Sequence, residues 1–197
     1  MSVKPILFNT VMVRAILCGS KTVTRRLVKA QHLKVLESQY HTKHPDVSDK
    51  TLIEKLCEPP FKKGDILYVR ETWAEWTGGY VYKAGTPPFT QAGESPVMRW
   101  KPSIHMPKEA ARIWLRVTGV RVERLQEIDA KQILREGINS NSNYMRFVFY
   151  QELWDSTIKK SNLDRYGWSA NPLVWVIEFG RYDKPETEGY LELKAIE

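Results

Sequence analysis

Alternation of apolar and polar residues is clearest over residues 112–125. Ile113, Leu115 and Val117 fall on one face, and the alternation resumes after Gly119. A period of two is typical of a half-buried strand, and a glycine inside it marks a bend or a bulge. The pattern therefore predicts one long strand that bends at Gly119, or two strands, of the kind that helps a sheet curl into a barrel.

Short apolar or β-branched runs predict further strands. These runs lie at residues 6–8, 22–28, 66–70, 80–84 and 173–179. The last run contains no polar residue from Leu173 to Ile177, so we expect it to be a central, buried strand.

Apolar residues at helical spacing predict three helices around these strands. The first follows a cap at Asn9 or Thr10 and ends before Gly19. The second and third cover residues 130–135 and 144–159. Because strands and helices are mixed along the chain, we expect an α+β fold.

Residues from about 30 to 60 differ in composition from the rest of the chain. They are polar, contain three of the four histidines and end in two prolines. We expect them to be an insertion in a single domain, residues 1–197, that ends in a charged tail from about residue 182. His41 and His44 have the spacing of a metal pair, but no convincing third and fourth ligands accompany them. We therefore expect solvated loop histidines, no metal and no other cofactor.

Charge and hydropathy limit the class of protein. Lys and Arg number 30 against 23 Asp and Glu, a formal net charge of +7, which favours an anionic partner such as a nucleotide or RNA. No apolar run reaches the length of a membrane span. The N-terminal segment lacks the pattern of a signal peptide, so we expect a cytoplasmic protein without a membrane partner.

The stretch from Leu17 to Arg26 carries the clearest candidate chemistry, because it combines a lysine, two threonines and two arginines without an acidic residue. Lys21 and Thr24 would face opposite sides of a regular strand, so they converge only if the backbone bends after Gly19. Lys21 as a base near pH 7 would need its pKa lowered by about three units, or about 4 kcal/mol. A charged Lys21 would instead stabilise negative charge. On spacing alone, a basic strand edge that binds phosphate is favoured over a catalytic role.

Two glutamates are candidate acids. Glu136 ends the helix that Asp129 caps, where the helix dipole disfavours a carboxylate, so it requires a cationic partner or a function. Glu71 ends the predicted strand 66–70, a position at which site residues often lie.

These motifs together resemble the ASCH domain family. The matching residues are Gly19, Lys21, Thr22, Thr24, Arg25 and Arg26, then residues 64–73, then Glu136 and Gly137, then residues 175–179. The resemblance implies a PUA-like mixed β-barrel with flanking helices and an inserted segment, and an association with RNA. The longer form, with residues 99–107, resembles proteins carried by bacteriophages and prophages.

One small bacterial member of this family is an amidohydrolase that removes the acetyl group from N4-acetylcytidine. The resemblance implies that Lys21, Thr24 and Glu136 are catalytic here and that no metal is needed. Positions along the chain suggest the remaining substrate-binding residues: an aromatic ring to stack on the base, an arginine to hold the pyrimidine carbonyl, and the second acid. These are Arg26, Tyr68, Arg70, Glu71, Trp73 and Trp76.

Three hypotheses follow, and none of them gives an oligomeric state. The first is a hydrolase of N4-acylated cytidine-type nucleosides, with a small-molecule nucleoside as substrate. The second is an RNA-binding PUA-like module without catalysis, and the third is a ribonuclease. A closed pocket sized for one nucleoside would favour the first. A basic cleft would favour the other two; its residues would be Arg25, Arg26, Lys29, Arg99 and Lys101.

Overall fold

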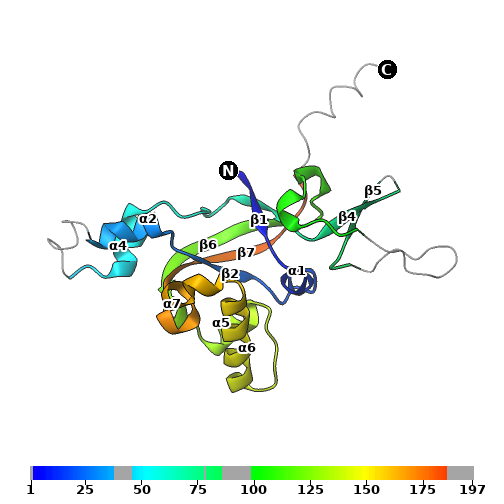
Figure 1. Cartoon of the computed structure of the whole chain (residues 1–197). Coiled ribbons are helices and arrows are strands. Elements are labelled where there is room, and N and C mark those ends of the chain that lie inside the picture. The colour runs from blue at the N-terminus through cyan, green and yellow to red at the C-terminus, as the bar shows by residue number, and fades with distance from the viewer. Residues whose placement is uncertain (1, 38–45, 78, 86–98, 186–197) are drawn as a thin grey trace, which may run out of the picture.

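The structure is a computed structural model that describes residues 2–37, 46–77, 79–85 and 99–185 (Figure 1). In this part of the chain, five strands form one sheet in the order β1-β3-β6-β7-β2, and two more form a hairpin. The strands are β1 (Val3–Leu7), β2 (Val23–Leu27), β3 (Ile66–Arg70), β4 (Trp73–Trp76), β5 (Gly79–Tyr82), β6 (Trp114–Arg124) and β7 (Leu173–Tyr182). The α-helices are α1 (Thr10–Leu17), α2 (Ala30–Leu33), α4 (Asp49–Leu56), α5 (Ala130–Arg135), α6 (Asn143–Ser156) and α7 (Leu163–Tyr166).

The long antiparallel pair β6–β7 is the spine of the sheet (Figure 1). Its register shifts between Val117 and Gly119, which confirms the predicted single strand with a bend. The predicted last strand is also central, since β7 pairs with β6 on one side and with β2 on the other. β3 pairs antiparallel with β6, and β1 joins the sheet parallel to β3.

The residues predicted to begin and end the first helix do so in the structure. The Asn9 side chain accepts a hydrogen bond from the backbone N–H of Met12 at 2.8 Å and so caps α1. Gly19 follows the helix with φ +79°, a conformation that glycine adopts without steric cost. This turn sends the chain back toward the sheet, where β2 begins at Val23.

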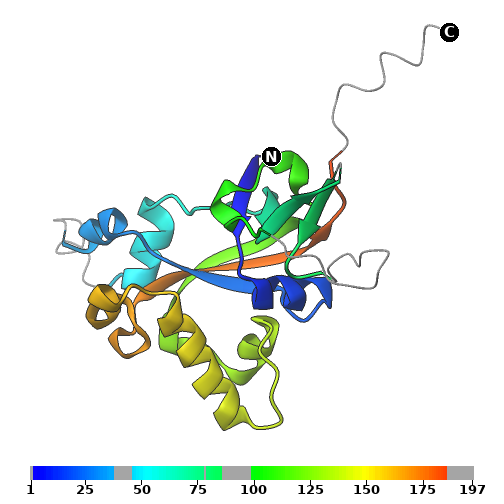
Figure 2. The same ribbon diagram turned by 45° about the vertical axis from the view of Figure 1, so that its right-hand side comes forward.

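Apolar clusters fill the two faces of the sheet. One contains the inward side chains of β6 and β7 together with α1 residues such as Val13 and Ile16. The other joins the opposite face of β2 and β7 to α5 and α6 through Ile133, Tyr150 and Trp154. Figure 2 shows α5 and α6 below the sheet and α1 beside its edge.

The α+β prediction, with flanking helices, is confirmed. The sheet is not a closed barrel within the described residues, because β1 and β2 lie at its two ends and do not pair. The Arg26 side chain spans the gap instead, with Nη2 donating to the backbone oxygen of Leu7 at 3.0 Å. The Arg26 side chain therefore links β1 and β2 where a closed barrel would have backbone hydrogen bonds between them, and space remains between these two edge strands.

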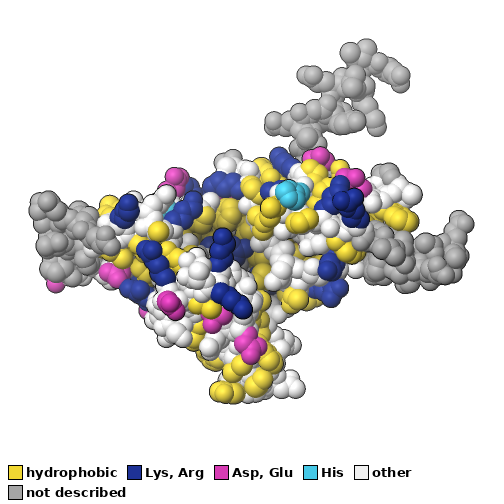
Figure 3. Space-filling model, viewed as in Figure 1, with side chains coloured by type: hydrophobic (Ala, Val, Ile, Leu, Met, Phe, Trp, Pro, Cys, Tyr) yellow, Lys and Arg dark blue, Asp and Glu magenta, His cyan; other side chains and the backbone are white. Residues whose placement is uncertain are grey.

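The described parts of the predicted insertion, residues 30–37 and 46–60, lie between β2 and β3. They form α2, a 3₁₀ turn and α4. The single-domain assignment stays a prediction, and residues 186–197 of the predicted tail lie outside the described ranges. None of the helices in those ranges has the length and apolar character needed to cross a bilayer. Lys and Arg side chains are spread over the face seen in Figure 3 rather than gathered in one patch.

Gly137→Ala is expected to destabilise the protein more than Gly19→Ala. Both glycines have positive φ, +89° and +79°, so alanine costs about 1–2 kcal/mol of backbone strain at each. A Cβ at residue 137 would lie 2.6 Å from the Ala15 Cβ and 3.1 Å from the Lys21 Cβ, whereas at residue 19 it meets nothing within 4 Å. In urea unfolding, Gly137→Ala should lower the free energy of unfolding by at least about 1 kcal/mol more than Gly19→Ala does. Equal losses would contradict the close packing of this turn on Lys21.

Candidate active site

Lys21 is a buried ammonium whose donors are all used. The residue is 2% exposed, and it forms an isolated antiparallel bridge with Glu136, a residue 115 positions later. Its Nζ donates to the backbone oxygens of Val23, at 2.9 Å, and of Glu136, at 3.0 Å. It also donates to Oε2 of Glu136 at 2.5 Å. Three acceptors match the three protons of a charged lysine, and they hold its side chain in one place.

Glu136 is paired with two cations. Besides Lys21, Nη1 of Arg25 donates to Glu136 Oε1 at 2.9 Å. Arg25 is held in turn by Nη2 contacts with Glu123 Oε2, at 3.0 Å, and with Gln132 Oε1. Glu136 caps the C-terminus of α5, so these cations meet the unfavourable dipole that the sequence indicated. Gln132 lies one turn earlier in the same helix and completes the cluster.

Burial lowers the pKa of Lys21 from its usual value, and the nearby Arg25 and Arg26 act in the same direction. The Glu136 carboxylate opposes them and raises it. Because Nζ is surrounded by three acceptors, the arrangement is that of a charged lysine. A proton-accepting role for Lys21 therefore depends on its exchange of a proton with Glu136.

Thr24 contacts Arg26 rather than Lys21 in the described structure. Nη1 of Arg26 donates to Thr24 Oγ1 at 2.7 Å, as expected for residues two apart on one face of β2. The Phe8 ring lies beside both cations, with its centroid 5.3 Å from Cζ of Arg26 and 5.7 Å from Nζ of Lys21. Thr24 is 1% exposed, so its hydroxyl is largely shielded from solvent beside the Arg26 cation.

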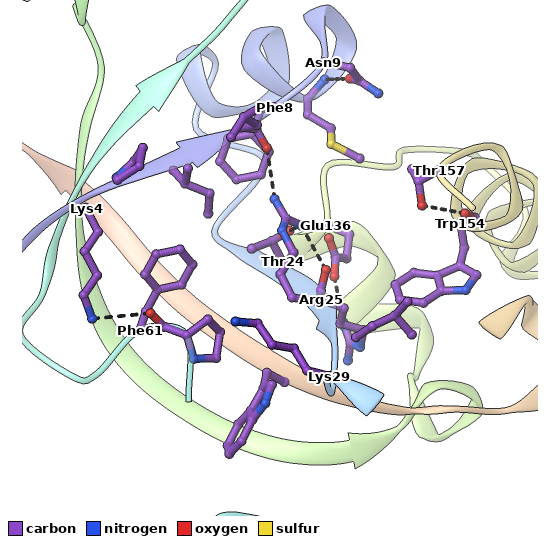
Figure 4. Close-up of a pocket in the computed structure, with 18 of the residues that line it drawn as sticks. Lys4, Phe8, Asn9, Thr24, Arg25, Lys29, Phe61, Glu136, Trp154 and Thr157 are labelled. Atoms are coloured by element: carbon purple, nitrogen blue, oxygen red, sulfur yellow. Dashed lines mark hydrogen bonds and ion pairs between the residues drawn. The ribbon is translucent and has the colours of Figure 1, made fainter. Parts of the chain in front are cut away.

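These residues border a pocket of about 1110 Å³ between the two edges of the sheet. Thr24, Arg25, Arg26 and Glu136 contribute to its wall. Figure 4 shows Thr24, Arg25 and Glu136 close together, with Phe8 above them and Trp154 of α6 at the other side. Lys4, Phe61 and Lys29 border the rest of the space (Figure 4). Lys21 has no exposed side-chain surface and reaches the pocket through Glu136.

Of the six predicted substrate-binding residues, the structure brings Arg26 into this pocket. Tyr68 packs on Trp114, with ring centroids 5.9 Å apart, and the Arg70 guanidinium donates to the backbone oxygen of Ile104. Both belong to β3, and β1 lies beyond β3 at the sheet edge that borders the pocket. Their place in the sheet therefore does not support contact with a ligand there.

The other three predicted residues also lie away from the pocket wall. Glu71 is 1% exposed and forms a bidentate pair with Arg112, with distances of 2.9 and 3.0 Å. Trp73 is buried beneath the Lys101 ammonium, and Trp76 is a partly exposed residue of the β4–β5 hairpin. Glu71 is thus satisfied by a structural ion pair, which sequence position alone did not reveal.

The predicted basic cleft divides in the structure. Arg25, Arg26 and Lys29 line the main pocket, whereas Arg99 and Lys101 line a second cavity of about 550 Å³ with Glu75. Groups of His, Cys, Asp and Glu that could hold a metal ion are absent from the described residues, and His41 and His44 fall outside them.

Sequence reasoning missed two kinds of pocket residue. Phe8 and Trp154 follow the apolar periodicity of their elements and were indistinguishable from core positions. Tyr150 falls on the apolar side of the predicted helix 144–159, together with Phe147 and Trp154, yet it also lines the pocket. The available signal was its hydroxyl, because a tyrosine on a buried face requires a polar partner.

No family model and no curated protein matches the chain. Solved structures similar to it include an ASCH domain from Lactobacillus crispatus JV V101, with 11% identity and a TM-score of 0.41 over 91% of this chain and 79% of that one. A protein of Enterococcus faecalis V583, described with the family DUF984, has 11% identity and a TM-score of 0.44 over 93% and 77%. A solution structure from Pyrococcus furiosus has 12% identity and a TM-score of 0.32 over 93% and 98%. The family that the sequence motifs resemble is thus represented among these structures.

Lys21→Met is expected to lower the free energy of unfolding by about 3–5 kcal/mol. The variant keeps the length of the side chain but leaves buried Glu136 and two backbone oxygens without their donor. Lys50→Met is the matched control, because Lys50 pairs with Glu127 at 2.8 Å at a site where the two side chains are 39% and 44% exposed. Its loss should stay within about 1 kcal/mol. Denaturant unfolding measures both, and similar losses would contradict a structural role for the buried pair.

Proposed function

We propose that the pocket is a hydrolase site that removes the acyl group from N4-acylated cytidine-type nucleosides. The observation that carries the proposal is that Thr24 and Glu136 line one pocket and that Lys21, buried behind Glu136, donates to its carboxylate at 2.5 Å, although Glu136 lies more than a hundred residues after the other two. The substrate class rests on the resemblance of these residues to the catalytic set of the ASCH amidohydrolase. We assign the chain to that family as part of the same proposal.

Thr24 is the nucleophile in this proposal. Its Oγ1 attacks the acyl carbon, and negative charge develops on the acyl oxygen. The guanidinium of Arg26, whose Nη1 donates to Oγ1 at 2.7 Å before the attack, is placed beside the reacting atoms to stabilise that charge. The hydroxyl proton passes to the Lys21–Glu136 pair and from it to the leaving N4 nitrogen. The bond between the acyl carbon and N4 then breaks, cytidine leaves with its amine restored, and water hydrolyses the acyl ester on Thr24.

Lys21 acts within this scheme as half of a proton-carrying pair. Its three hydrogen bonds orient Glu136 toward the pocket, and Arg25 restrains the other carboxylate oxygen. Two cations beside one carboxylate also stabilise the anionic intermediate of acyl transfer, because their charges are fixed in place before the reaction. The preorganised charges of β2 and α5 therefore perform the work that a metal ion performs in other hydrolases.

Thr24→Val should reduce kcat for release of cytidine from N4-acetylcytidine by at least about 100-fold, because valine has the same shape and lacks the hydroxyl. Thr22→Val is the matched control, since Thr22 Oγ1 accepts from Arg135 Nε at 3.3 Å outside the pocket, and it should retain turnover. Chromatographic detection of cytidine measures both rates.

Mass spectrometry of quenched reactions adds a second readout, since the wild type should gain the mass of one acyl group. Absence of turnover by the wild type, or full turnover by Thr24→Val, would refute the proposed reaction. Turnover that depends on Thr24 without an acylated protein would show instead that Thr24 positions a water molecule.

A second candidate function, RNA binding without catalysis, is favoured by the size of the pocket. Its volume of about 1110 Å³ lies just above the usual range for small-molecule sites, about 300–1,000 Å³. One nucleoside would leave part of it unfilled. The exposed Lys29 at the end of β2 lies on this wall, where it can meet a phosphate. The ribonuclease hypothesis has no comparable support in the geometry.

RNA binding predicts a steep dependence of affinity on salt. Fluorescence anisotropy with a labelled single-stranded RNA should show the logarithm of the binding constant falling linearly with the logarithm of salt concentration. Lys29→Ala should reduce that slope by about one unit, as expected for one phosphate contact. Lys50→Ala, on α4 away from the pocket, should leave it unchanged. A slope unaffected by Lys29→Ala would contradict polymer binding at this pocket.

A further inference from the structure

We infer that Tyr150 and Arg25 form a subsite that binds the ring carbonyl oxygen of a pyrimidine. The inference rests on the proposed function for the identity of the ligand, and it adds two recognition groups on the far side of β2 from Thr24. Two buried polar atoms carry it: the Tyr150 hydroxyl and Nε of Arg25 both lack a hydrogen-bond partner within the described structure.

Tyr150 is placed by the packing of α6. The residue is 3% exposed, and its ring meets Trp168 edge-on, with centroids 6.0 Å apart and an interplanar angle of 79°. Tyr150 also lines the pocket, next to Leu153 and Trp154 of the same helix. A buried hydroxyl without a partner is unfavourable, so its retention at a pocket wall indicates a partner among the ligands of that pocket.

Arg25 offers the second donor. Both of its terminal nitrogens are used by Glu136, Glu123 and Gln132, and its side chain is 1% exposed. Its Nε is the one nitrogen of this guanidinium that has no acceptor in the described residues. The guanidinium lies near enough to Tyr150 to lower the pKa of the hydroxyl through its charge and through a side-chain interaction of the hydrogen-bond type, although neither Nε nor the hydroxyl has a partner with full hydrogen-bond geometry.

The two groups select an uncharged acceptor. Burial, with help from Glu136, raises the pKa of Tyr150 well above its usual value, so the hydroxyl keeps its proton and can donate. Arg25 Nε can only donate. The charge of Arg25 is already matched by Glu123 and Glu136, and a further anion beside Glu136 would be repelled. A carbonyl oxygen therefore suits this pair better than a phosphate or a carboxylate.

Strand geometry separates this carbonyl from the reacting one. Thr24 and Arg25 are successive residues of β2, so their side chains leave opposite faces of the strand. β2 is an edge strand, and a flat ligand along its free edge can meet both faces. When the acyl group on N4 lies at Thr24, the carbonyl oxygen that the cytosine ring itself offers to this subsite is O2. Tyr150 is a positioning and specificity residue in this arrangement, not the nucleophile.

Binding of cytidine and of 2-thiocytidine, measured by isothermal titration calorimetry, tests the subsite without any need for turnover. Sulfur is a weaker acceptor than oxygen, so the wild type should bind cytidine about tenfold more tightly, which corresponds to about 1.4 kcal/mol. Tyr150→Phe keeps the ring and its packing and should bring the ratio of the two affinities close to one. Tyr182→Phe, a partly buried tyrosine outside the pocket, is the matched control and should keep the wild-type ratio.

The outcomes separate this inference from the proposed function. An unchanged ratio in folded Tyr150→Phe, or no binding of either nucleoside by the wild type, would overturn the subsite; the first result would mean that the hydroxyl meets a water molecule. The expected ratios without hydrolysis of N4-acetylcytidine would refute the reaction and leave the subsite standing. If hydrolysis occurs, Tyr150→Phe should raise KM about tenfold and leave kcat within about threefold.

Discussion

The rest of the site depends on one buried carboxylate held between two cations. Glu136 joins the C-terminus of α5 to Lys21, just before β2, and to Arg25 within β2. Removal of such charges from water is costly, so a buried pair is retained only with good geometry and further hydrogen bonds. Here every proton of Lys21 has an acceptor, and Gln132 and Glu123 restrain Arg25. The cluster fixes α5 against the edge of the sheet.

The edge position of β2 gives this cluster access to a ligand. An interior strand would bury both backbone edges in ladders, whereas β2 pairs with β7 alone. Lys21 and Arg26 also satisfy backbone groups on that free edge. Lys21 donates to the backbone oxygen of Val23, and Arg26 donates to that of Arg25. Strand edges with unpaired groups invite aggregation unless they are covered. Arg26 thus both protects this edge and forms part of the pocket wall.

Sequence patterns predicted the elements of this fold because each signal is local. A cap at Asn9, a turn at Gly19 and a bend at Gly119 depend on side chains and backbone angles within a few residues. These local signals did not predict that the sheet stays open within the described residues. Closure of a barrel depends on the distance between β1 and β2, which lie at opposite ends of the sheet order. Tyr68, Arg70, Glu71, Trp73 and Trp76 do not line the pocket, and their role in substrate binding stays a prediction. For Tyr68 and Arg70 the reason is again position in the sheet, because β1 lies between β3 and the sheet edge that borders the pocket.

The sequence by itself determined the charged motif around Lys21, the helix that ends at Glu136 and the need for a cation there, since these follow from residue type and the helix dipole. Tertiary structure alone decided which cations meet Glu136 and that Glu71 belongs to an ion pair with Arg112. It also decided that Tyr150 reaches the pocket from α6. The physical reason is distance: these contacts join residues that no local periodicity relates, and only the packing of helices on the sheet brings them together.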